Sequence, residues 1–178
     1  MESERQEMTL GHFVEVAARM SSDDFLRRFR EPVLLAMGVL ETEELEARLG
    51  RTSEIRVSRP LAYDRGEVHP LAGKIFRLPV LAMPQGTLVI GRDEPAEVVV
   101  PDETVSVRHC ALTWNKMEVR VTDLGSTNGT FVNLRPVERD DSIRLGDEDI
   151  LTVGRHSFQF YRPAHFFRVL RGLAAAAE

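Results

Sequence analysis

The chain has 178 residues, of which 43% are hydrophobic and 29% are charged, and its net charge is -5 at pH 7. These values are typical of a globular protein with one principal core, and they argue against a disordered or fibrous chain. No apolar run approaches the ~20 residues that a membrane-spanning helix needs. The acidic charge also disfavours broad binding to a nucleic-acid backbone. We therefore expect a protein that binds neither membrane nor nucleic acid.

The first residues, MESERQEM, are acidic, whereas a secretory signal would carry positive charge followed by a long apolar segment. This start predicts a cytoplasmic protein. Cys110 is the single cysteine of the sequence, and no group of Cys and His residues has the spacing of a zinc site. We expect neither an internal disulfide, nor a metal, nor a cofactor.

Residues 1–66 predict a helical N-terminal extension that ends in a linker. Apolar residues recur at helical spacing in residues 8–20. A second helical pattern follows Ser21, which forms a capping box with Asp24, and this pattern ends at Pro32.

Residues 42–50 predict a third helical segment of the extension, because apolar residues again recur and a glycine follows them as a C-cap. From residue 51 onward the signal fades, which indicates a linker with room for a short strand.

Residues 67–162 have a different character, with short β-type runs separated by Gly, Pro, Asp and Asn. The nine runs are KIFRLPV, TLVIG, EVVV, CALTW, EVRVTDL, TFVN, SIRL, DILTVG and HSFQFY. Such a series, without room for helices between the runs, indicates an antiparallel sandwich or barrel. Residues 163–178 return to helix formers and predict a C-terminal helix with Phe166, Phe167 and Leu170 on one side.

Two polar loops are expected to meet at one end of the predicted sheet. The run CALTW can turn at Asn115 and return as EVRVTDL, so the segments before the first strand and after the second lie at the same end. These segments are PDETVSVRH, residues 101–109, and GSTNG, residues 125–129. Together they bring Ser106, Thr127 and Asn128 close to Arg108 and His109.

Each of these residues also has an ordinary structural interpretation. Asn128-Gly129 is a strong hairpin signal because both residues accept a positive φ, and a histidine next to a strand is more often hydrogen-bonded within the fold than catalytic. Ser106, His109 and Asp123 supply the residue types of a nucleophilic triad, but the sequence has no glycine-flanked nucleophile elbow. We expect no catalytic residues.

The order of the fragments TLVIGR, VSVRHC, DLGSTNGTFVN and RLGDEDILTVG resembles the forkhead-associated (FHA) domain, a family of phosphothreonine-peptide readers. The resemblance covers about residues 67–162. It implies a mainly β fold, an antiparallel β-sandwich of about eleven strands, which the nine runs match within the error of element boundaries. Members of this family bind their ligand through loops at one end of the sandwich.

The resemblance implies that Arg92 and Ser106 hold the phosphate. In a common form of the family motif a polar or basic residue follows the serine, but this chain has Val107 there and a basic residue, Arg108, one position later. Arg108 is therefore a third candidate for the phosphate. A phosphothreonine carries about -1.5 to -2 charge and three strong acceptor oxygens, which suit guanidinium and hydroxyl donors.

The same resemblance places Thr127 and Asn128 along the bound peptide, with the Asn128 amide pairing with the peptide main chain on both its donor and its acceptor side. Gly91, His109 and Gly129 match positions that shape the loops.

These features predict a cytoplasmic, non-enzymatic adaptor in Ser/Thr kinase signalling. Its partner would be a phosphothreonine-containing protein or peptide, such as a kinase or its substrate. The alternative is a phosphate-independent docking scaffold that uses the sandwich loops or the helical flanks. A further hypothesis concerns Thr9, Thr42 and Thr52, because a phosphorylated threonine outside the β region could occupy the binding site of its own or a neighbouring chain.

Overall fold

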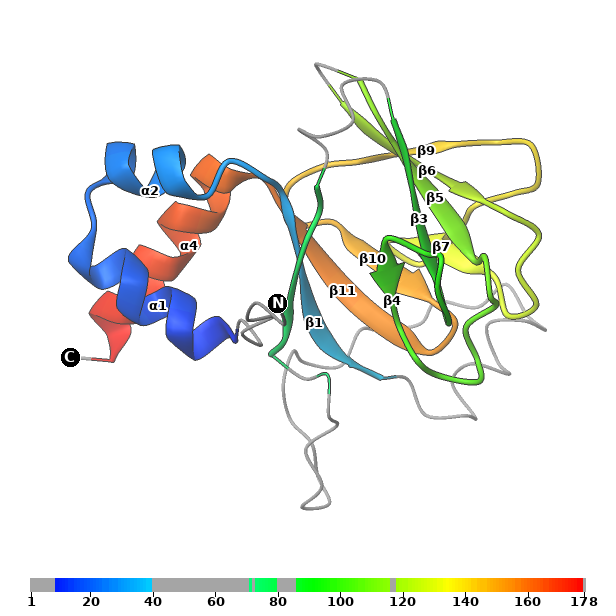
Figure 1. Ribbon diagram of the computed structural model, residues 1–178, viewed down its shortest axis with the longest axis horizontal. Helices are drawn as coiled ribbons and strands as arrows, with labels where there is room; N and C mark the ends of the chain where they lie inside the picture. The colour runs from blue at the N-terminus through cyan, green and yellow to red at the C-terminus, as the bar shows by residue number, and fades with distance from the viewer. Residues whose placement is uncertain (1–8, 40–70, 72, 80–85, 116–117, 178) are drawn as a thin grey trace.

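The computed structural model describes residues 9–39, 71, 73–79, 86–115 and 118–177. Two sheets face each other and helices lie at one side of them (Figure 1). The 6-stranded sheet has the order β2 (Ile75–Arg77), β1 (Val33–Val39), β11 (His156–Tyr161), β10 (Ile150–Val153), β7 (Thr130–Val132) and β8 (Arg135–Pro136). The 5-stranded sheet has the order β4 (Val98–Val99), β3 (Thr87–Gly91), β5 (Cys110–Trp114), β6 (Val119–Asp123) and β9 (Ile143–Leu145).

The space between the two sheets is filled by one apolar core. Alternate residues of several strands point into it, as in β11, where Phe158 and Phe160 are buried and the residue between them is half-buried. Each of the nine β-type runs contains a strand, so the predicted mainly β sandwich is confirmed. The 5-stranded sheet is mixed rather than purely antiparallel, because β3 and β4 pair in parallel through Ile90 and Val98.

Strand β1 comes from the N-terminal extension, where the sequence predicted helices and a linker. It pairs with β11 and with β2, and its first four residues are buried. Leu34 and Ala36 face the sandwich core, whereas Val33 and Leu35 face a second apolar cluster on the other side of the sheet. The extension therefore supplies a strand to the sandwich, because this segment is apolar enough to be buried on both faces.

The described helices are α1 (Leu10–Arg19), α2 (Ser22–Arg28) and α4 (Pro163–Ala176). Both patterns expected in residues 8–32 and the C-terminal helix are present. Ser21 caps α2 by accepting a hydrogen bond from the amide of Asp24 at 3.2 Å, and its hydroxyl donates to the Asp24 carboxylate at 2.7 Å. The helix expected at residues 42–50 and the linker after it lie outside the described residues.

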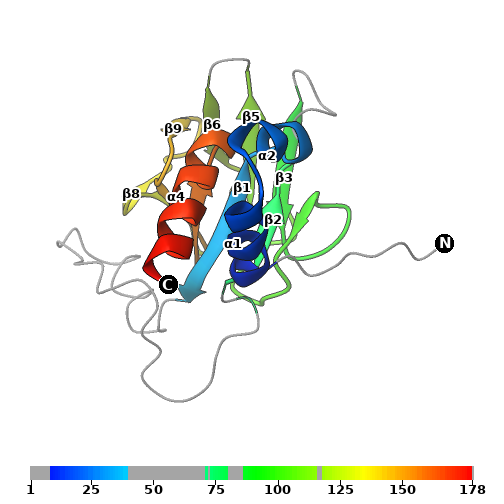
Figure 2. The ribbon, with the colours of Figure 1, turned by 90° about the vertical axis from the view of Figure 1, so that its left-hand side faces the viewer.

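The helices cover the outer face of β1 and β2 (Figure 2). Phe13 of α1 and Phe166 of α4 meet with ring centroids 5.4 Å apart, and Phe25 of α2 lies 5.0 Å from Phe167. Arg171 of α4 donates hydrogen bonds to the last carbonyl groups of α1. The two ends of the chain thus form one small helical layer, and none of its described helices is long and apolar enough to cross a membrane.

Replacing Phe166 by alanine should lower the free energy of unfolding by about 3–5 kcal/mol, because the ring is 2% exposed and its loss leaves a cavity between α1 and β11. Urea denaturation measures this change. Leu173→Ala is the matched control, since Leu173 on the same helix is 44% exposed and should change stability by less than about 0.5 kcal/mol. Equal losses in both variants would contradict this packing.

Candidate functional site

Arg92 and Ser106 lie together at one end of the sandwich. Arg92 follows β3 directly, and its backbone N–H donates a 3.0 Å hydrogen bond to the carbonyl of Ser106. Strands β3 and β5 pair antiparallel up to Ile90 and Cys110, so the chain after β3 runs beside the chain before β5. The structure therefore brings together the two residues on which the phosphate-binding prediction depends.

The Arg92 side chain is 40% exposed and bonds the Asp93 carboxylate through Nε at 3.0 Å. This bond leaves both terminal amino groups of the guanidinium without a hydrogen bond to any described residue. Asp93 thus holds the group through Nε, and the two terminal amino groups are left as donors that suit an oxyanion. Arg108 is exposed, and its side chain forms no ion pair or hydrogen bond with the described residues.

The GSTNG loop contacts Thr104 and Ser106 through two hydrogen bonds, as its position after β6 predicted. The amide of Thr127 donates to the Ser106 hydroxyl at 3.1 Å, and the Asn128 side-chain amide donates to the carbonyl of Thr104 at 2.8 Å. The Ser106 hydroxyl can still donate its own proton, and Asn128 keeps its side-chain oxygen and a second N–H. Both loops therefore present polar groups at the same end of the molecule.

His109 is buried and joins the two loops. Its Nδ1 accepts a hydrogen bond from the backbone N–H of Ser106 at 3.0 Å, so the proton is assigned to Nε2, which donates to the carbonyl of Gly129 at 2.9 Å. Burial lowers the pKa of His109, although the bond to Gly129 and the negative charge of Asp123 oppose this effect. The neutral ring is thus a structural link between the loops.

Asp123 holds the GSTNG loop rather than serving a catalytic triad. Its carboxylate accepts hydrogen bonds from the amides of Gly125 and Ser126 and from the hydroxyl groups of Ser126 and Thr130. Burial alone would raise the pKa of Asp123, but these bonds outweigh it and lower the pKa. Because His109 bonds the backbone of Ser106, the three residues do not form the proton relay of a triad.

A partly buried ion pair next to the Ser106 segment was not expected from the sequence. Asp102 accepts hydrogen bonds from the amide and hydroxyl of Thr104 and a two-pronged contact from Arg155 at 3.1 and 2.6 Å. Burial would raise the pKa of Asp102, but the bonds from Thr104, Arg155 and His156 hold it well below its usual range. This network fixes Thr104, whose carbonyl holds Asn128. Asp102 and Thr104 have the spacing of a local side-chain turn, whereas no sequence signal points to Arg155.

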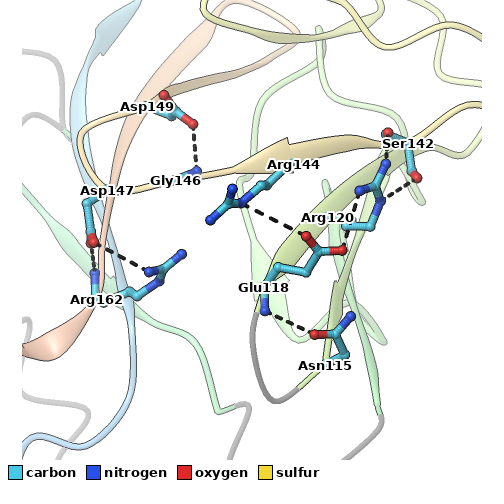
Figure 3. A network of polar contacts seen from close by, with 9 residues as sticks. All are labelled: Asn115, Glu118, Arg120, Ser142, Arg144, Gly146, Asp147, Asp149 and Arg162. Atoms are coloured by element: carbon cyan, nitrogen blue, oxygen red, sulfur yellow. Dashed lines mark hydrogen bonds and ion pairs between the residues drawn. The ribbon is translucent and has the colours of Figure 1, made fainter.

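A second polar network lies on β6, β9 and the segment that leads to β10 (Figure 3). Arg120 bonds Ser142 and Glu118, and Glu118 also lies 4.0 Å from Arg144. Asp147 accepts a 2.6 Å hydrogen bond from the amide of Arg162, directly before α4. These charges pair with one another and hold the strands and α4 in place, so this network is not the candidate site.

The β region is similar to known proteins. The FHA domain model matches residues 88–154. FHA domain-containing protein FhaA from Mycobacterium tuberculosis is 40% identical over 72 residues, which are 38% of this chain and 14% of that protein. Glycogen accumulation regulator GarA from Mycolicibacterium smegmatis is 36% identical over 91 residues, or 51% of this chain and 52% of GarA.

Among solved structures, one from a study of phosphothreonine-dependent FHA domain interactions is 25% identical, with a TM-score of 0.46, and the match covers 73% of this chain and 94% of the other. The chain spans about half or less of the length of the curated relatives named above.

Gly91→Ala should destabilise the protein by forcing apart the backbone segments that carry Arg92 and Ser106. A Cβ at position 91 would lie 2.0 Å from the carbonyl oxygen of Val107, which is backbone and must move. We expect a loss of about 1–3 kcal/mol in the free energy of unfolding, measured by urea denaturation. The control is Gly172→Ala in α4, where nothing lies within 4 Å and alanine should stabilise the helix by up to about 1 kcal/mol. A Gly91→Ala protein as stable as the unmodified chain would refute this close approach.

The free energy of unfolding should fall as the pH drops below about 6.5, because the unfolded chain then protonates His109 while burial lowers its pKa in the folded protein. Asp102 and Asp123 have lowered pKa values, so their contributions are lost only below about pH 4. Urea denaturation from pH 7.5 to 5 should therefore show a shallower pH dependence for His109→Gln than for the unmodified chain. Equal slopes would show that His109 does not titrate as its burial requires.

Proposed function

We propose that the chain is a member of the forkhead-associated (FHA) domain family, whose model matches residues 88–154, and that its sandwich binds a phosphothreonine-containing segment of a partner protein. Arg92, Ser106 and Arg108 hold the phosphate. Thr127 and Asn128 contact the peptide main chain, and Gly91, His109 and Gly129 keep the loops in place. The protein acts as a cytoplasmic, non-enzymatic adaptor in Ser/Thr kinase signalling, and its partner is a kinase or a kinase substrate.

The observation that carries this proposal is the hydrogen bond between the backbone of Arg92 and that of Ser106. It holds the backbones of an arginine and a serine side by side at one end of the sandwich, which supports a site that both side chains could share. A phosphate monoester offers three acceptor oxygens and at least one full negative charge, which matches these donors. Because the donors are fixed before the ligand arrives, little ordering entropy is lost on binding.

The expected affinity follows from these few contacts. Hydrogen bonds to charged groups contribute roughly 1.5–3 kcal/mol each. Two or three such bonds, together with main-chain bonds to Asn128 and after the entropy cost of association, correspond to a dissociation constant of about 1 μM. Affinity should also fall below about pH 6, where the phosphate loses its second charge.

Of the threonines outside the β region, Thr9 accepts a hydrogen bond from the amide of His12 and caps α1, and Thr42 and Thr52 lie outside the described residues. The hypothesis that one of them, once phosphorylated, occupies the binding site stays a prediction. Sizing of the chain before and after treatment with a Ser/Thr kinase tests its between-chain form.

Arg92→Ala and Ser106→Ala should each weaken binding of a phosphothreonine peptide by about 10- to 100-fold, as loss of one bond to a charged group implies. Titration calorimetry with peptides selected from a degenerate phosphothreonine library measures this loss. Arg144→Ala is the matched control, because Arg144 is an exposed arginine of the same sandwich whose nearest charged contact is 4.0 Å away.

The phosphate-independent scaffold gives the opposite pattern in this experiment. Binding would then persist in Arg92→Ala, and the unphosphorylated peptide would bind as tightly as the phosphorylated one. Either result would overturn the proposal. Thermal unfolding of each variant shows that a loss of binding is not a loss of fold, since both replaced side chains are partly exposed.

A further inference from the structure

The turn between β10 and β11 reaches the candidate site from the opposite sheet. Gly154 and Arg155 form this turn, and both strands belong to the 6-stranded sheet (Figure 1). The Ser106 segment leads into β5 of the 5-stranded sheet. Arg155 hydrogen-bonds Asp102 and Thr104, which precede Ser106 in that segment. The turn therefore links the two sheets at the candidate-site end of the sandwich.

The turn holds Thr104 through its backbone and its side chain. Arg155 bonds one carboxylate oxygen of Asp102 through Nε at 3.1 Å and Nη2 at 2.6 Å. The other oxygen of Asp102 accepts the amide and the hydroxyl of Thr104 at 2.9 and 2.6 Å. The backbone N–H of Arg155 also donates to the Thr104 hydroxyl at 3.2 Å. Because the Asp102 side chain is only 9% exposed, salt screens this pair less than a surface pair.

Gly154 brings the same turn against the carbonyl of Thr104. Its φ is +57, and a Cβ at this position would lie 2.6 Å from the Thr104 carbonyl oxygen. That oxygen accepts a hydrogen bond from Nδ2 of Asn128 at 2.8 Å. The turn and Asn128 therefore contact one carbonyl group, and the place of this group depends on the turn.

The Thr104 carbonyl determines which way the Asn128 amide faces. A carbonyl oxygen accepts hydrogen bonds and cannot donate them, so Nδ2 of Asn128 faces it, and the reversed amide would place two oxygens together. The Asn128 oxygen and its second N–H are then left for other partners. These are the two groups that the proposed function assigns to the main chain of the ligand.

We propose that Arg155 is a positioning residue for Asn128, and that it acts on ligand binding through Asp102 and Thr104. This inference rests on the proposed function and adds to it a residue of the opposite sheet. Arg155 fixes the orientation of the amide before the ligand arrives. It therefore affects recognition of the ligand main chain and not of the phosphate.

A double-mutant cycle tests this role, with calorimetric titration of one phosphothreonine peptide that the unmodified chain binds. Asn128→Ala should weaken binding at least about fivefold, because two neutral hydrogen bonds to the ligand are lost. Arg155→Met should weaken it about three- to tenfold, because the Asn128 side chain must then be immobilised on binding. In the Asn128→Ala background, Arg155→Met should change the affinity by less than about twofold, since the side chain that it positions is gone.

The control variant is Arg144→Met, because Arg144 is an exposed arginine of the same sandwich. It should keep the affinity in both backgrounds. Arg155→Met should stay folded, since Asp102 keeps its bonds to Thr104 and its 3.2 Å contact with His156, and thermal unfolding checks this. If Arg155→Met does not fold, Arg155→Lys replaces it in the cycle, because lysine keeps the charge and loses the two-pronged contact.

The outcomes separate the positioning role from the phosphate site. An equal loss of affinity from Arg155→Met with and without the Asn128 side chain would overturn the positioning role. Unchanged affinity in Arg155→Met or in Asn128→Ala would overturn it as well, and each of these results leaves the phosphate site intact. Failure of the unmodified chain to bind any phosphorylated peptide would overturn the proposed function and the positioning role with it.

Discussion

The close approach between the end of β3 and the segment before β5 is the constraint on which the candidate site depends. Gly91 leaves room for the carbonyl of Val107, and the next residue, Arg92, donates its backbone N–H to Ser106. No side chain fits between these two pieces of chain. The backbones of Arg92 and Ser106, 14 positions apart in sequence, are thereby fixed as neighbours.

The loops at the candidate-site end of the sandwich are held by side chains that a ligand need not contact. His109 joins the backbone of Ser106 to the carbonyl of Gly129. Asp123 accepts hydrogen bonds from the amides and hydroxyl groups of its own loop. Asp102, which is paired with Arg155, holds Thr104. Such supporting bonds order the site before a ligand arrives, which lowers the entropy cost of binding. The helical layer stabilises the opposite face of one sheet and leaves this end uncovered (Figure 1).

The sequence predicted most of the sandwich because one face of most strands is buried, so alternation is visible, as in HSFQFY. It did not predict β1, since VLLAMGV is buried on both faces and reads as an unbroken apolar run. It missed β8 because Arg135–Pro136 is only two residues long, is exposed and contains a proline, so it shows no alternating apolar pattern. The meeting of the two loops was predictable from one hairpin, whereas the pairing of Asp102 with Arg155, 53 residues apart, is set by the tertiary fold.

The most direct test of this account is the nuclear magnetic resonance spectrum of the backbone amides during titration with a phosphothreonine peptide. The account predicts that the amides of Arg92, Ser106 and Thr127 shift together, with one dissociation constant, while those of α1 and α4 stay unchanged. The unphosphorylated peptide should shift none of them. Shifts confined to the helical layer, or equal shifts with both peptides, would contradict the claim that this end of the sandwich recognises a phosphate ester.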